Sequence, residues 1–581
     1  MERKTSPRGV PGVIDGLSAI RLRPMLLAAC LCAVLTLPVA WNARTFVSND
    51  GISYLDMAVN TIRHGPGYLL TNGSWSPGYP ALLAVILKLV HPSPASESAV
   101  VHSLDWAICA VTYFCFTYFF VNFLRWIHLV HGPGLDKGLG FLGVLIFAYT
   151  LLFVSNIDIS LWLVGPNIMV EGVAYLIAGV CIRLRLPDSR FIHQAALGAL
   201  MALAYVTKAA MFPLSLALLG FFLVWPASRD TGRKGTAVAA VAFLLAASPL
   251  VATLSYSRGR LTFSDIGGLN FAWYVNEVPR YWDVQLPDSA TLLHPPRILS
   301  SNPAIVKFDG PANVTYPYWY DPSYWYDGVK GHFDAHQVLR QFLRFLGAVP
   351  TTRPNTATAL QLSTRWIPIY AGLAAFVFVG LRFRKLYQVI RTQLWLFLWP
   401  AAAVFTFASV HVEYRYLVPF VVLAWTTLFA AASVVTGSDR STGINLTVAV
   451  YLLFTYCPTF AREVVQYHRR PAAFSAIAAK LKALGIQPGD ELASVGFADF
   501  AYDARLVGAR FTMQMPNGNH AVPPRDDPAA FSKLPEAEVR RTLAILRANG
   551  AKALFSPWRP AFDNDSGWVP IGQRDYIRML Q

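Results

Sequence analysis

Long apolar blocks separated by short basic loops are the feature that most constrains this chain. The first block, "PMLLAACLCAVLTLPVAW", is followed by others long enough to cross a hydrocarbon core of about 30 Å, which takes about 20 apolar residues as a helix. Charged residues make up only 14% of the 581 residues, whereas about a quarter of a typical soluble domain is charged. The chain is therefore expected to be a polytopic membrane protein.

Charge in the loops predicts how the spans are oriented. Lys and Arg cluster in alternate loops, and the positive-inside rule places those loops in the cytoplasm. The net charge of +16 is spread over these short clusters, which indicates membrane orientation rather than a nucleic-acid partner. About eleven spans satisfy the rule: an uncleaved first span from about residue 25, then Ala99–Leu124, Gly138–Val154, Asn167–Cys181, His193–Val206, Met211–Trp225, Ala237–Tyr256, Trp366–Leu381, Leu394–Val410, Tyr416–Val435 and Leu446–Pro458.

Two apolar segments allow a second interpretation. The first block could be a cleaved signal peptide, but an uncleaved span is favoured because no small-x-small site precedes Trp41. The stretch "ALLAVILKLV" after Pro80 is too short to span alone, so it is expected to be an interfacial or re-entrant helix.

This orientation divides the chain into a cytoplasmic N-terminus (1–24), a transmembrane domain (25–461) with external loops at 43–98 and 257–365, and an external tail (462–581). The second loop contains "NVTYPYWYDPSYWYDG", whose aromatic residues suit a membrane interface or the face of a sugar equally well. The tail alternates amphipathic helix patterns with short apolar strands, which predicts a small α/β domain. We interpret this domain as a binding or lid module.

An aspartate stands directly after the first span, in "SNDGISYLDMAVNTIRHGPGYLLTNGSWSPGYP". Asp50 is then at the external membrane surface, where an ionisable residue is a functional candidate by default. The alternative is a helix N-cap, because Asp50 precedes a helical pattern and Asp is a favoured capping residue. Asp56 is explained more simply as part of the solvated face of that helix.

Several motifs resemble those of the GT-C glycosyltransferases, integral membrane enzymes that take a sugar from a polyprenyl-phosphate donor. In the first loop they are Asp50, Tyr54 four residues later, a helix ending at Gly65, and "SPGYP" leading back into apolar sequence. "LWLVGPNIMVEGVAYLIAGV", "GALMALAYVTKAAMFPLSLALL" and "HVEYRYLVPFVVLAW" follow in the expected order. Mannosyl and aminoarabinose transferases carry an Asp-Glu pair where this chain has Asp50 and Gly51. This difference favours the bacterial branch with a single acidic residue, related to mannosyl, aminoarabinose and galacturonosyl transferases.

The resemblance implies a GT-C-like helical fold and transfer of a sugar from a polyprenyl-phosphate donor to a lipid, glycan or protein acceptor outside the membrane. Transfer is expected to invert the anomeric centre with a single Asp as base, because the acceptor attacks directly. Asp50 is the expected base. Asp158 and Glu171 are expected to support the acceptor or to orient Asp50. A plain loop role for Asp158 and a pairing of Glu171 with Lys208 are the alternatives.

Cations are expected for the donor phosphate. Arg415 and Lys208 stand at predicted outer ends of spans, and Arg suits bidentate phosphate contacts while Lys acts as a point charge. Interfacial snorkelling would explain both residues equally well, and Glu413 could simply pair with Arg415. Tyr54 and Tyr79, from the same motif as Asp50, are the expected substrate-binding residues.

No cofactor is expected, because no motif with metal-ligand spacing occurs, although a divalent cation at Asp50 stays an open alternative. The main alternative function is a secondary transporter or a lipid flippase, folds that usually show internal repeats and paired broken helices. We find no half-to-half similarity of that kind. The bacterial branch implies a multi-pass protein of the inner membrane whose catalytic face and α/β domain are periplasmic.

Overall fold

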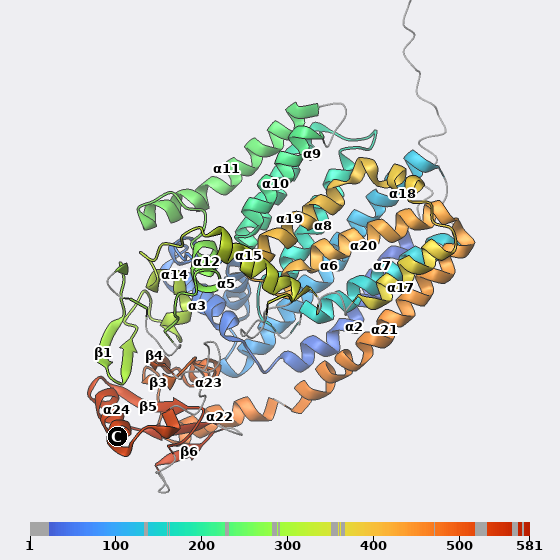
Figure 1. The fold of residues 1–581 in the computed structure, drawn as a ribbon. Coiled ribbons are helices and arrows are strands. Elements are labelled where there is room, and N and C mark those ends of the chain that lie inside the picture. Colours follow the sequence, from blue (N-terminus) through green and yellow to red (C-terminus); the bar gives the residue numbers. More distant parts are fainter. Residues whose placement is uncertain are drawn as a thin grey trace, which may run out of the picture.

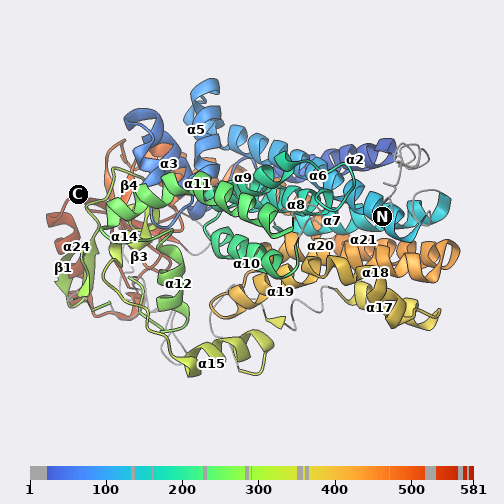
Figure 2. The same cartoon turned by 90° about the horizontal axis from the view of Figure 1, so that it is seen from above.

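The computed structural model describes residues 22–580 apart from 133–137, 160, 162, 227–231, 282–286, 289–290, 350–357, 360, 362–365, 470, 517–530, 561–566 and 572–574. Most of the predicted cytoplasmic N-terminus, 1–24, therefore lies outside the described residues. The chain forms a long helical bundle with a small α/β layer at one end (Figures 1 and 2).

Each of the expected spans coincides with an α-helix. Within the described residues, six helices are long and apolar enough to cross a membrane by themselves. The number rises to seven if α17 (Ile367–Phe378) and the next helix, α18 (Phe383–Ile390), form one span bent by 117°. The bundle helices are α2 (Leu22–Ala43), α6 (Pro94–His131), α7 (Gly138–Ile159), α8 (Asn167–Arg183), α9 (Phe191–Thr207), α10 (Met211–Val224), α11 (Gly232–Arg258), α17 (Ile367–Phe378), α19 (Trp395–Ala408), α20 (Tyr414–Thr436) and α21 (Ser438–Arg469).

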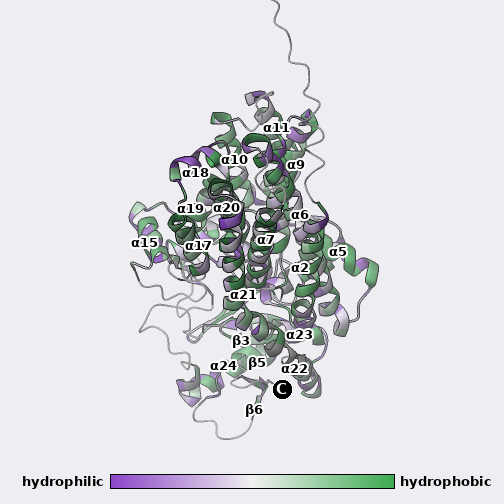
Figure 3. Ribbon diagram, turned by 90° about the vertical axis from the view of Figure 1, so that its right-hand side faces the viewer, coloured by the Kyte–Doolittle hydropathy of each residue, from purple (hydrophilic) through white to green (hydrophobic). Residues whose placement is uncertain are grey.

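The bundle is apolar inside and outside, as a membrane domain must be. Its core includes a row of fully buried phenylalanines on α6, among them Phe116, Phe119 and Phe123. On the outer surface, Leu27 of α2 is 70% exposed and Phe454 of α21 is 77% exposed, which suits contact with lipid rather than water. Figure 3 shows hydrophobic residues along most of the bundle and hydrophilic ones at the end that carries α18. The polytopic membrane fold is confirmed.

Two helices extend further than the sequence suggested. Helix α7 continues to Ile159, so the first five residues of "SNIDIS", a stretch expected as a loop, supply its last turn. Helix α21 continues past its predicted end at Pro458 to Arg469 and leads towards α22 (Pro471–Ala483). Charged residues beyond the apolar segment do not end a helix by themselves, since Arg, Glu and Gln are good helix formers.

Short helices cover the opposite end of the bundle from α18. They are α3 (Asn49–His64), α4 (Gly67–Leu70), α5 (Gly78–Val90), α12 (Ile266–Tyr274), α13 (Pro317–Tyr320), α14 (Pro322–Trp325) and α15 (Ala335–Leu346). Helix α5 contains the short apolar stretch after Pro80, and its 13 residues are too few to cross a bilayer. We call these helices and the sheet beyond them the external layer, after the side of the membrane that the loop charges predict for them.

A seven-stranded sheet completes the external layer, in the order β1-β2-β4-β3-β5-β7-β6. Its centre, β4-β3-β5, is parallel, and α23 (Ala501–Val507) and α24 (Glu536–Ala548) connect these strands. The sequence did not predict that the hairpin β1–β2 from the second external loop would extend this sheet, with Val306 paired to Gln514. The strands are β1 (Arg297–Ser301), β2 (Ala304–Lys307), β3 (Glu491–Val495), β4 (Arg510–Met515), β5 (Ala551–Ser556), β6 (Trp568–Pro570) and β7 (Tyr576–Met579).

A buried charge cluster holds the sheet domain against the first external loop. Arg505 of α23 forms two 2.8 Å contacts with the carboxylate of Glu97 on α6 and also pairs with Asp56 on α3. Asp56 also accepts a hydrogen bond from the backbone N–H of Thr315 at 2.8 Å. Asp56 is therefore buried, not on a solvated face as predicted, and it ties the α/β layer to the helix that carries Asp50.

Candidate active site

A cavity of about 1330 Å³ lies between the external layer and the end of the bundle away from α18. One wall is the start of α3, a second is formed by the break between α9 and α10 and by residues before α20, and a third is the sheet. Asp50, Lys208 and Arg415 all line it. The cavity thus collects the predicted base and both predicted cations from segments that are far apart in the sequence.

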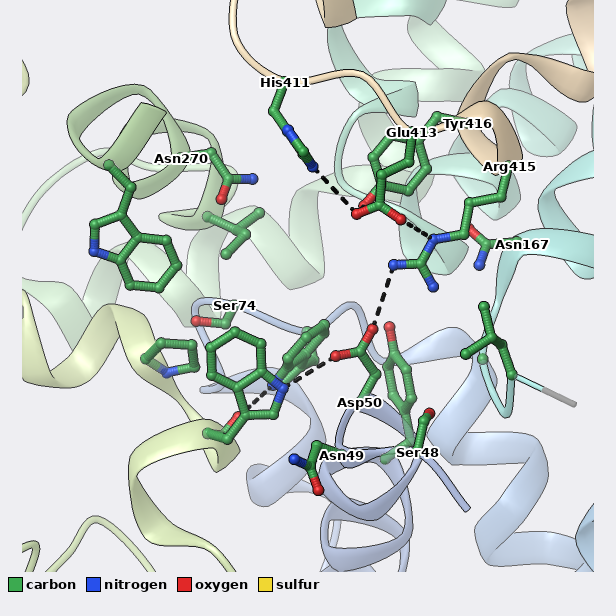
Figure 4. Close-up of a pocket in the computed structure, with 18 of the residues that line it drawn as sticks. Ser48, Asn49, Asp50, Ser74, Asn167, Asn270, His411, Glu413, Arg415 and Tyr416 are labelled. Carbon is green, nitrogen blue, oxygen red and sulfur yellow. Dashed lines mark hydrogen bonds and ion pairs between the residues drawn. The ribbon is translucent and has the colours of Figure 1, made fainter. Parts of the chain in front are cut away.

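Asp50 is in the first turn of α3 and does not cap that helix. The N-cap is Ser48, whose hydroxyl accepts a hydrogen bond from Gly51 N at 3.3 Å. The carboxylate of Asp50 instead accepts a hydrogen bond from the indole Nε1 of Trp319 at 3.0 Å and lies 3.5 Å from Arg415 Nη2 (Figure 4). The positive end of the helix dipole and the guanidinium group both favour a negative charge here.

Two side chains hold the backbone of Trp319 in place. Its carbonyl accepts hydrogen bonds from the hydroxyl of Ser53 at 2.9 Å and from the indole of Trp75 at 3.0 Å. Both donors belong to the first external loop, whereas Trp319 belongs to the second. The indole that contacts Asp50 is therefore fixed relative to α3.

Arg415 lies between two carboxylates. Its Nε is 2.6 Å from Glu413, and Glu413 also contacts His411 at 3.2 Å and accepts a hydrogen bond from Tyr416 at 3.0 Å. Burial opposes the charge on Glu413, but the His411 contact and the charge of Arg415 outweigh it and lower the pKa of Glu413 to about 2. Figure 4 shows Glu413 and His411 on the side of Arg415 away from Asp50. The guanidinium group is thus oriented towards Asp50 by an ionised partner.

Lys208 lies in the break between α9 and α10, outside both helices. Its ammonium group donates to Asn167 Oδ1 at 2.8 Å and sits 3.7 Å above the ring of Tyr416. Burial, followed by the nearby charge of Arg415, lowers the pKa of Lys208 to about 7. Arg415 Cζ lies 5.4 Å from the centre of the same ring, so both predicted cations contact one tyrosine.

The other predicted site residues are placed differently. Tyr54 is buried and contributes to the cavity wall, where its ring packs edge-on against Trp75. Tyr79 is fully buried, and its hydroxyl donates to Asp105 at 2.6 Å. Glu171 is fully buried within the bundle and accepts a hydrogen bond from Tyr175 at 2.5 Å.

Neither Tyr79 nor Glu171 is among the residues that line the described cavity. Glu171 is not paired with Lys208 either, because Lys208 contacts Asn167 instead. The backbone of Asp158 is in the last turn of α7, and its side chain lies outside the described part of the chain.

Several cavity residues were not identified from the sequence. The sequence indicated Trp319 only as one of many aromatic residues in the second external loop. It indicated Glu413 only as a partner for Arg415. From the tail, Phe497 and Asp499 follow β3, and Asp575 precedes β7. For Phe497 and Asp499, the position after a strand of the parallel centre was the available signal, since loops at the carboxyl ends of parallel strands form ligand crevices. No group of three or more His, Cys, Asp or Glu side chains is placed to hold a metal ion within the described ranges.

Comparison with known proteins gives a structural match and no sequence match. No family model and no curated protein sequence matches this chain. ArnT from Cupriavidus metallidurans in the apo state aligns with a TM-score of 0.53 and 13% identity over 95% of this chain and 97% of ArnT. ArnT bound to undecaprenyl phosphate aligns with a TM-score of 0.51 and 13% identity over 96% of this chain and 97% of ArnT.

A larger protein shares the same architecture in part. The arabinofuranosyltransferase AftD from Mycobacteria aligns with a TM-score of 0.50 and 12% identity over 97% of this chain but only 40% of AftD. At these identities the alignments establish a shared fold. The chain therefore has the GT-C fold that its motifs predicted.

Proposed function

We propose that this protein is a membrane glycosyltransferase that moves a sugar from a polyprenyl-phosphate donor to an acceptor on the external face of the membrane. The observation that carries the proposal is the facing pair of Asp50 and Arg415 in a cavity at the end of the bundle away from α18. A base and a phosphate-binding cation stand in contact where a lipid head group would enter. The shared fold with ArnT, a protein that binds undecaprenyl phosphate, supports the same class of donor.

The proposed reaction exchanges one bond of the anomeric carbon to oxygen for another and transfers one proton to Asp50. An acceptor hydroxyl loses its proton to the carboxylate of Asp50 while its oxygen attacks the anomeric carbon of the donor sugar. The bond from that carbon to the phosphate oxygen breaks, and polyprenyl phosphate leaves with one more negative charge than it carried in the donor. A single carboxylate is enough because the acceptor attacks directly and inverts the anomeric centre.

Arg415 and Lys208 are proposed to stabilise the leaving phosphate. The guanidinium fork has five N–H donors, and its two ion pairs use Nε and one terminal nitrogen, so it can contact a phosphate oxygen without rotating. Lys208, with a pKa near 7, gains a proton more readily when a second negative charge appears beside it. Preorganised cations of this kind act where charge develops in the transition state.

The remaining assignments follow from the orientation of the bundle. Basic loops at the α18 end predict that end to be cytoplasmic, so the cavity and the α/β layer are proposed to face the periplasm of a bacterial inner membrane. Asp50 lies near the membrane surface, where "SPGYP" returns the chain towards the lipid. We propose no cofactor, and a divalent cation beside Asp50 is the alternative.

A transfer assay tests the proposed function. The full-length protein in lipid nanodiscs is given a panel of radiolabelled polyprenyl-phosphate sugars together with a membrane extract as a source of acceptors. We expect label to leave the donor lipid with the wild-type protein and with Asp309→Asn, an exposed carboxylate of the same layer, but not with Asp50→Asn. Movement of intact donor across proteoliposome membranes without release of the sugar would instead identify a flippase and overturn the proposal.

A further inference from the structure

The sheet has a topological switch point at the carboxyl end of β3. The chain leaves β3 through α23 to its neighbour β4 on one side, and later passes through α24 to its neighbour β5 on the other side. Two connections that depart in opposite directions leave a crevice at the end of the central strand. In open α/β sheets ligands bind in this crevice.

This crevice opens into the same cavity as Asp50. Phe497, which follows β3, packs edge-on against Trp319 with 5.1 Å between the ring centroids, and Trp319 donates to Asp50. On the other side, Asn49 of α3 donates to the carbonyl of Ala498 at 3.1 Å. The crevice and the predicted base are therefore separated by one aromatic ring and are fixed relative to each other.

The crevice presents carboxylates and apolar rings. Asp499 after β3 is exposed to the cavity and Asp575 before β7 is half-buried, while the rings of Phe497 and Phe500 are half-buried beside them. Enclosure by the surrounding protein, together with the charge of Asp575, raises the pKa of Asp499 to about 6. Carboxylates accept hydrogen bonds from hydroxyl or ammonium groups and repel phosphates and other carboxylates. The same cavity thus contains this acidic crevice and the two cations, Arg415 and Lys208.

We propose that the crevice at the carboxyl ends of β3 and β5 is the acceptor subsite, and that it takes a carbohydrate which presents hydroxyl groups and carries no negative charge at the point of contact. The apolar rings contact a sugar face, and Asp499 and Asp575 accept hydrogen bonds from its hydroxyl groups. The acceptor oxygen then reaches Asp50 past Trp319, while the donor phosphate contacts Arg415 and Lys208. The role of this carbohydrate as the acceptor rests on the proposed glycosyl transfer. The binding of a neutral carbohydrate in the crevice does not depend on that transfer.

A binding experiment tests the subsite without requiring turnover. The full-length protein in nanodiscs is applied to an array of neutral, amino-bearing, carboxylated and phosphorylated oligosaccharides. We expect binding among the neutral or amino-bearing glycans, and at least tenfold weaker binding by Asp499→Asn/Asp575→Asn. Glu536→Gln is the matched control, because this exposed carboxylate on α24 pairs with Arg540 away from the cavity.

Each outcome decides one of the two proposals. Binding confined to phosphorylated or carboxylated glycans, unchanged binding by the double variant, or no binding on the whole array overturns the subsite. Glycosyl transfer by the double variant with an unchanged acceptor KM also overturns the subsite and leaves the proposed function intact. The protein could also bind glycans in a way that depends on the two carboxylates but transfer no sugar from any donor. This result would support the subsite and overturn the proposed transferase function.

Discussion

Asp50 contacts both Trp319 and Arg415, although the three residues come from three different thirds of the chain. Asp50 and Arg415 could be proposed from the sequence because each belongs to a local motif beside a span. Trp319 could not, since nothing in "NVTYPYWYDPSYWYDG" distinguishes one aromatic residue from the others. Glu171 was a reasonable candidate for the active site because it is a lone carboxylate in an apolar span. In the structure it is buried in the bundle and accepts a hydrogen bond from Tyr175.

Lys208 predicts a pH dependence of donor binding. Its lowered pKa of about 7 means that the ammonium charge is present below pH 7 and lost above it. A hydrogen bond to a charged group contributes roughly 1.5–3 kcal/mol, so donor KM should rise by on the order of tenfold between pH 6 and pH 8. Lys208→Arg keeps its charge throughout this range and should show a change of less than about twofold. Steady-state kinetics at saturating acceptor check this, and a parallel rise of KM in both proteins would contradict the assigned role.

At the level of elements, Arg505 links α23 of the sheet domain to α3 and α6. Replacing it with Met removes one partner of a buried charge cluster and leaves Asp56 and Glu97 uncompensated, at a cost of about 3–5 kcal/mol. We expect a clear fall in the thermal unfolding temperature of the detergent-solubilised protein. Arg540→Met removes an exposed pair on α24 and should cost less than about 1 kcal/mol. Equal unfolding temperatures for the two variants would show that the cluster does not hold the layer to the bundle.

The helices themselves were largely predictable, since apolar length and periodicity are local properties. Their ends were less so. Ser48 rather than Asp50 caps α3, and both residues are good capping types two positions apart, so only the backbone geometry decides between them. The pairing of β2 with β4 joins two segments that are far apart in the sequence, and register at that range depends on the packed sheet rather than on local pattern.

For the whole molecule, the distribution of basic loops predicted which end of the bundle carries the site. The positive-inside rule also predicts that the external layer and α18 lie on opposite sides of the membrane. In a background without the six native cysteines, Asp309→Cys in the external layer should react with a membrane-impermeant maleimide added to intact bacterial spheroplasts. Lys385→Cys on α18 should react only after the membrane is permeabilised; both positions are exposed in the structure. Labelling in the reverse order would place the cavity in the cytoplasm.

The most direct test of Asp50 as the base measures two properties on the same preparation of Asp50→Asn: binding of undecaprenyl phosphate, the proposed leaving group, and sugar transfer. The substitution keeps the size of the side chain and the contact with Trp319 but removes the base, and a positioned general base contributes roughly 10²–10⁴-fold to rate. We predict that labelled undecaprenyl phosphate binds with a Kd within about twofold of wild type, while transfer falls by at least about 100-fold. Undiminished transfer by Asp50→Asn would contradict the assignment of Asp50 as the base.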